Sequence, residues 1–132
     1  MDNLPQSLIY LNCSECKIQH LDNLPFKLRN LICNNNKIIN LNMLPMNLTE
    51  LNCSDNLIIE LENLPHSLIK LNCSFNSINK LNSLPRKLEE LFHSNSEILN
   101  IPQTLKNIYN NKVKISFFNI THKRHTNFAI EA

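Results

Sequence analysis

The chain of 132 residues contains no glycine and no tryptophan. Without glycine there is no Gly-rich phosphate loop, no dinucleotide-binding fingerprint and no Gly-flanked nucleophile elbow, because each needs backbone conformations that glycine supplies. Turns with a positive φ are expected to use asparagine instead. The first residues carry neither a basic region nor an apolar run, and long apolar stretches are missing. We therefore expect a cytoplasmic protein that is not secreted, with no membrane partner and with reduced cysteines.

What the sequence does contain is a repeat. Asparagine, leucine and isoleucine supply 61 of the 132 residues, and the first five of six prolines stand at 5, 25, 45, 65 and 85. Aligning on these prolines gives the pattern Leu-Pro-x-x-Leu-x-x-Leu-x-Cys-x-x-Asn-x-Ile-x-x-Leu. Five units follow it in register, over residues 4–23, 24–43, 44–63, 64–83 and 84–100. A sixth, degenerate unit keeps the spacing of its apolar residues through Ile115.

The core Leu-x-x-Leu-x-Cys-x-x-Asn-x-Ile resembles the leucine-rich repeat. The unit length of 20 and the Leu-Pro pair resemble the repeats of bacterial secreted effectors, and the Cys- and Asn-rich version resembles repeat proteins of amoeba-infecting giant DNA viruses, which would place the chain in a host cytoplasm. The residues after the repeats do not resemble a ubiquitin-ligase domain, so we do not expect that activity from the resemblance. We expect a leucine-rich-repeat solenoid over residues 1–115 and a capping or tail segment over 116–132.

Physical reasoning predicts the same fold. Leu11-x-Cys13 and its equivalents alternate between core and solvent, which indicates a short half-buried strand. Successive strands are expected to stack in parallel on the concave face of the solenoid. Too few residues remain per turn for a helix, so we expect extended, polyproline or short 3₁₀ segments on the convex side.

Two repeat positions are assigned structural roles. The resemblance implies that the asparagines of one position turn inward and hydrogen-bond the backbone of adjacent turns: Asn36, Asn56 and Asn76. The cysteines of another position are expected in the core as small hydrophobic residues: Cys13, Cys33, Cys53 and Cys73. The spacing Cys13-x-x-Cys16 is also that of a zinc or redox pair, but the repeat favours the structural interpretation. We expect no cofactor, no metal site and no catalytic residue.

The outward side chains of the strands are the candidate binding surface, because solenoids bind partners through an extended concave face. Most of them are short and polar, which drift without selection would also produce. Phe92 and Tyr109 are expected to be neighbours on the sheet. The candidate partner-binding residues are Tyr10, Ile32, Glu50, Lys70, Phe75, Glu90, Phe92 and Tyr109.

We therefore predict a non-enzymatic module that binds an unidentified protein. One alternative is nucleic-acid binding through a basic C-terminal cluster, which the slightly acidic repeat body disfavours. Another is a redundant family copy without a dedicated partner. The N-terminal edge of the sheet has no cap in the sequence, which predicts either a homodimer through that edge or a shortened relative of a longer protein. The basic cluster comprises Lys106, Lys112, Lys114, Lys123 and Arg124.

Overall fold

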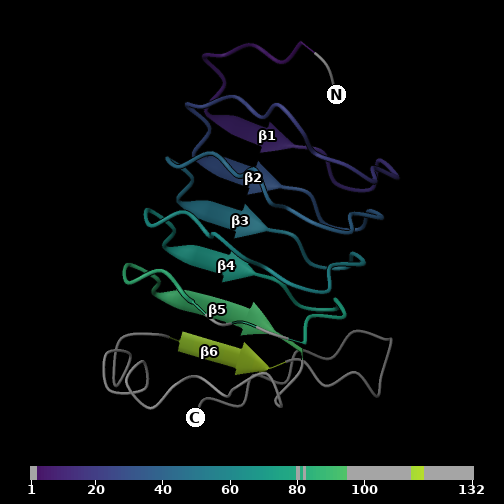
Figure 1. The fold of residues 1–132 in the computed structure, drawn as a ribbon, viewed down its shortest axis with the longest axis vertical. Coiled ribbons are helices and arrows are strands. Elements are labelled where there is room, and N and C mark those ends of the chain that lie inside the picture. The colour runs from purple at the N-terminus through teal and green to yellow at the C-terminus, as the bar shows by residue number, and fades with distance from the viewer. Residues whose placement is uncertain (1–2, 80, 82, 95–113, 118–132) are drawn as a thin grey trace.

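The computed structural model describes residues 3–79, 81 and 83–94, together with the backbone of residues 114–117. Its strands form one parallel sheet in chain order, so each strand pairs with the next along the sequence (Figure 1). The described residues contain no helix, and hence none that could cross a membrane. The strands are β1 (Tyr10–Asn12), β2 (Asn30–Ile32), β3 (Glu50–Asn52), β4 (Lys70–Asn72), β5 (Glu90–His93) and β6 (Lys114–Phe117).

The repeat period sets the register of the first five strands. The leucine at the centre of each strand pairs with the leucine 20 residues further on, from Leu11 and Leu31 to Leu71 and Leu91. Each turn of the chain therefore advances the sheet by one strand, about 4.8 Å. The predicted solenoid with a parallel sheet is confirmed.

Each of the first five prolines begins a tight turn. The carbonyl of Pro25 accepts a hydrogen bond from the Leu28 N–H at 3.0 Å, and the equivalent bonds recur between 3.0 and 3.1 Å in the other four units. Proline donates no hydrogen bond, but its carbonyl still closes a four-residue β-turn. This turn directs the chain back toward the sheet, and the leucine that ends it is buried in the four units that lead into β2 to β5.

The corner after each of the strands β1 to β4 is left-handed, and here the prediction that asparagine would supply every positive φ is wrong. Glu15, Asn35, Asp55 and Phe75 occupy the same repeat position with φ between 52° and 57°. The reason is tertiary, because the Asp55 N–H donates to the Ser74 carbonyl at 3.0 Å, and Glu15 and Asn35 bond equivalently. A hydrogen bond to the next turn thus holds the bend whichever side chain stands there.

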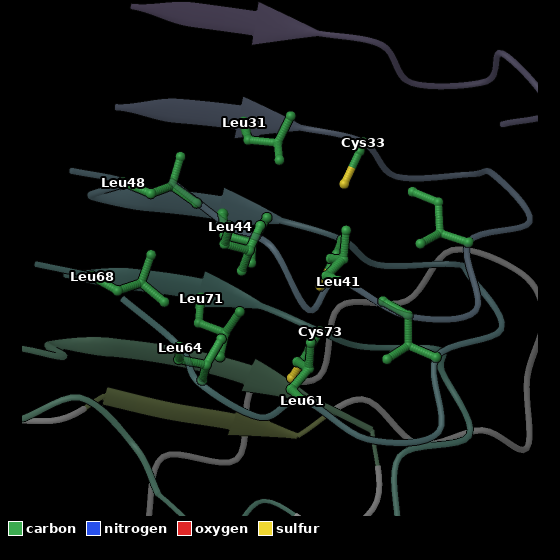
Figure 2. Close-up of a cluster of buried hydrophobic side chains, with 14 of the residues drawn as sticks. Leu31, Cys33, Leu41, Leu44, Leu48, Leu61, Leu64, Leu68, Leu71 and Cys73 are labelled. Atoms are coloured by element: carbon green, nitrogen blue, oxygen red, sulfur yellow. The ribbon is translucent and has the colours of Figure 1, made fainter. Parts of the chain in front are cut away.

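The core lies between the sheet and the returning segment of each turn. Leu31 and Leu71 from the strands meet Leu44 and Leu64 from the opposite side, and Cys33 and Cys73 lie beside them (Figure 2). These six side chains are buried, whereas the first turn is less covered, with Leu8 and Leu11 only partly buried. One turn cannot bury its own leucines, so stability comes from stacking.

The inward asparagines join successive turns. Asn56 Nδ2 donates to the carbonyls of Cys33 at 3.0 Å and Cys53 at 3.1 Å. Its Oδ1 accepts the N–H of Ile38 at 2.9 Å. Asn36 and Asn76 make equivalent bonds to the backbone of their own and the preceding turn. A buried amide is tolerated in the core because its donors and acceptor are satisfied in this way.

The sixth strand begins later than expected. Lys114–Phe117 pairs with β5, which sets Ile115 opposite Leu91 and Ser116 opposite Phe92. Ser116 therefore occupies the place beside Phe92 where Tyr109 was expected, and Tyr109 itself lies outside the described residues. Ile115 and Phe117 alternate with polar residues, as is typical of strands. The sheet also continues beyond residue 115, where the expected domain boundary falls.

β1 forms the other end of the sheet and pairs with β2 alone among the described strands. Dimerisation through this edge stays a prediction, which sedimentation over a range of concentrations tests. The expected cap after β6 and most of the basic C-terminal cluster lie outside the described residues. The nucleic-acid alternative therefore also stays a prediction, for which steeply salt-dependent oligonucleotide binding is the test.

Candidate functional site

The face of the sheet that points away from the core carries a shallow depression of about 230 Å³ across β2 to β5. We call this surface the sheet face. Five of the predicted partner-binding residues line the depression: Ile32, Glu50, Lys70, Glu90 and Phe92. They come together because the in-register strands bring equivalent repeat positions side by side. The strands are short, so the depression runs across them rather than along any one of them.

Charge alternates along one line of this face. In the sheet register Glu50 lies opposite Lys70, and Lys70 lies opposite Glu90. Lys70 Nζ lies 3.6 Å from Glu90 Oε1, with both side chains partly exposed, so the pair contributes less than about 1 kcal/mol to stability. Glu50 is exposed and has no cation within ion-pair distance in the described part of the chain. The position thus offers a negative charge to a ligand.

The remaining predicted residues lie apart from the depression. Tyr10 is 51% exposed on β1, one strand beyond it. Phe75 lies at the left-handed corner that follows β4 and is 40% exposed. Tyr109 lies outside the described residues.

Sequence reasoning missed an apolar surface on the flank where the prolines turn the chain. Phe26, Met43 and Met46 are each more than half exposed there, and Lys27 Nζ lies 5.8 Å from the centre of the Phe26 ring. A groove of about 240 Å³ on the same flank is lined partly by Met46 and His66. The signal was available, because Phe26, Met46 and His66 each directly follow a repeat proline.

The five cysteines fall into two environments. Cys13, Cys33, Cys53 and Cys73 are buried and Cys16 is exposed, all as free thiols. Burial raises the pKa of Cys13 to about 11 and of Cys33 and Cys73 to about 12, and it raises the pKa of Cys53 as well. Cys16 Sγ donates instead to the Ser14 carbonyl at 3.1 Å. No group of three or more candidate metal ligands occurs within the described ranges.

We expect one fast and four slow thiols when the native protein meets a colorimetric thiol reagent. Cys16 reacts quickly because it is exposed, whereas the other four thiols are covered, and burial raises their pKa so that they stay protonated at neutral pH. All five react quickly in urea. In a Cys16→Ser variant we expect no fast phase. Five fast thiols in the native protein would contradict the burial of the other four cysteines.

The same burial makes the fold sensitive to alkali. Thiols of the unfolded chain ionise near pH 9, whereas the buried thiols hold their protons until about pH 11 to 12. Their stabilising contribution is therefore complete below pH 9 and is lost as the pH rises toward 12. We expect a lower urea midpoint at pH 10 than at pH 8, and a smaller drop in a Cys73→Ala variant. An equal drop in both proteins would contradict this.

Comparison with known proteins identifies the repeat family. No protein-family model and no curated protein matches the chain. Among solved structures, the leucine-rich-repeat domain of a Shigella effector matches 92% of this chain at 27% identity and a TM-score of 0.72. YopM from Yersinia enterocolitica matches 70% of this chain at 32% identity and a TM-score of 0.52.

The chain spans about half of the Shigella structure (55%) and a quarter of YopM (25%). The resemblance to giant-virus repeat proteins stays an expectation, because both of these structures come from bacterial proteins. The match extends over most of the turns described above, and it includes their parallel strands. The chain is a leucine-rich-repeat protein whose short repeats resemble those of bacterial effectors.

Proposed function

We propose that this protein is a non-enzymatic module that binds a partner protein through the sheet face. The observation that carries the proposal is the depression across β2 to β5, where Ile32 and Phe92 flank polar and charged side chains. Apolar anchors with charged neighbours are typical of binding hot spots. Leucine-rich-repeat folds of the effector type generally mediate protein–protein interaction, which supports the same proposal.

Within this proposal the residues divide by role. Ile32 and Phe92 are partly buried apolar anchors, and Glu50, Lys70 and Glu90 select among partners by charge. A stacked array of turns presents an extended surface, whereas catalysis needs groups that converge on one point. The proposed site of action is the cytoplasm, where free thiols such as these remain reduced.

Affinity capture from a eukaryotic cell lysate tests the proposal. Wild-type protein is compared with an Ile32→Ala/Phe92→Ala variant of the sheet face and with a matched Phe26→Ala/Met43→Ala variant of the proline flank. We expect a partner that binds wild type and the flank variant but not the sheet-face variant. Equal capture by wild type and the sheet-face variant would overturn the proposal, and loss in the flank variant alone would assign binding to the flank.

A further inference from the structure

Two asparagines in the depression hold their amides in one orientation. Asn52 Oδ1 accepts hydrogen bonds from the Ser54 N–H at 3.2 Å and from its hydroxyl at 2.8 Å. Asn72 Oδ1 accepts the Ser74 N–H at 3.1 Å. A backbone N–H only donates, so the amide atom that faces it is the oxygen. Each Nδ2 lies on the other side of its amide and has no acceptor within hydrogen-bond distance among the described residues.

These two donors stand between two apolar side chains. Asn52 pairs with Asn72 in the sheet register, Ile32 precedes them on β2 and Phe92 follows on β5. The line across four strands therefore consists of an apolar residue, two asparagines of the lining with unsatisfied N–H₂ donors and another apolar residue. Three strand spacings of about 4.8 Å separate Ile32 from Phe92, or about 14 Å.

This line matches the chemistry of an extended peptide. A β-strand rises about 3.3 Å per residue, so residues i and i+4 lie about 13 Å apart on the same face. Backbone carbonyls between them supply the acceptors that the two donors lack. A phosphate backbone would be repelled by Glu50 and Glu90, and a glycan offers no pair of apolar groups for Ile32 and Phe92.

We propose that the sheet face binds an extended peptide segment of its partner, which runs across β2 to β5. Two apolar side chains four residues apart lie on Ile32 and Phe92, and the carbonyls between them accept from Asn52 and Asn72 Nδ2. A lysine or arginine of the segment lies beside Glu50. The inference rests on the proposed function and specifies the partner's chemistry.

A displayed library of random 12-residue peptides, selected on the immobilised full chain, is the first test. We expect enriched peptides with two apolar residues four positions apart and a neighbouring basic residue. Failure to enrich any such motif would overturn the inference. The proposed function would survive that failure if protein capture still depended on Ile32 and Phe92, since the partner would then present a folded surface.

The binding of the selected peptides is then titrated with variants in which the Nδ2 donors of Asn52 and Asn72 are replaced by acceptors. Asn52→Asp and Asn72→Asp keep the oxygen that accepts the serine N–H, so the turn stays intact, but each replaces the outward donor by an acceptor. We expect the double variant to bind about ten-fold more weakly or worse. Asn12→Asp is the matched control, because Asn12 makes the same bonds to Ser14 on β1, outside the depression; we expect it to bind like wild type.

The structural integrity of the double variant is checked by its urea midpoint. If it is unfolded, Ile32→Ala provides the second measurement, with weaker binding of the same peptides expected. Unchanged binding by a folded double variant, or by Ile32→Ala, would overturn the inference. Binding of oligosaccharides that the two substitutions abolish would also overturn it, as would self-association of the wild type that they abolish.

Discussion

Replacing Asn56 by alanine is expected to lower the free energy of unfolding by about 2–4 kcal/mol. Asn56 is buried and bonds the carbonyls of Cys33 and Cys53 and the N–H of Ile38. Alanine leaves these backbone groups inside the core without a partner, and each such group is costly. These bonds join two turns, so their loss weakens the contact between the turns as well as the turn that contains Asn56. Urea denaturation followed by circular dichroism measures the effect.

Asn42→Ala is the matched control for this substitution. Asn42 is exposed on the convex side, so its replacement is expected to change stability by less than about 0.5 kcal/mol. Asn36→Ala provides a second measurement should the Asn56 variant not fold, because Asn36 makes equivalent bonds at a partly exposed position nearer the end of the array. Indistinguishable urea midpoints for the Asn56 and Asn42 variants would show that the inward amides are not structural.

Replacing Leu51 by alanine is expected to cost about 2–5 kcal/mol. Leu51 is 2% exposed at the centre of β3, between Leu31 and Leu71. Removing its side chain leaves a cavity that adjoins two neighbouring turns, so both contacts of that turn weaken together. A thermal melt shows the loss directly, and a shift of less than about one degree would contradict the assignment of this leucine to the core.

Alanine substitutions of two other leucines provide comparisons for Leu51→Ala. Leu11 occupies the same repeat position on β1 but is partly buried, and β2 is its one neighbour among the described strands, so Leu11→Ala is expected to cost less than Leu51→Ala. Leu57 is more than half exposed on the convex side, and Leu57→Ala is expected to have little effect. A different order of the three melting temperatures would mean that stacking between turns does not govern stability.

Much of the fold was predictable because the same pattern occurs in five units, and each unit supports the secondary structure predicted from the others. A single Leu-x-Cys segment predicts a strand weakly, but five copies at one spacing also determine which strands are neighbours and in which register. The same alignment placed the cysteines in the core and identified the inward asparagines from the family pattern. It also brought Ile32, Glu50 and Lys70 onto one face, since equivalent positions of a solenoid align.

Prediction failed where the period breaks. After residue 94 the spacing no longer identifies the next strand, and it is the hydrogen-bond pairing with β5 that identifies Lys114–Phe117 as a strand. Sequence reasoning also overlooked the apolar flank at Phe26 and Met46. The repeat pattern is defined by residues that recur, whereas these positions vary from turn to turn.

The sequence by itself determined the solenoid, its register over five strands, its proline turns and its core, because each follows from the 20-residue period and from which side chains avoid water. Tertiary structure alone decided three things. It imposed left-handed corners on Glu15 and Phe75, determined where the sixth strand lies, and fixed the amide oxygens of Asn52 and Asn72 on serine N–H groups. All three depend on hydrogen bonds or strand pairing of the folded backbone, which a pattern of side chains does not specify.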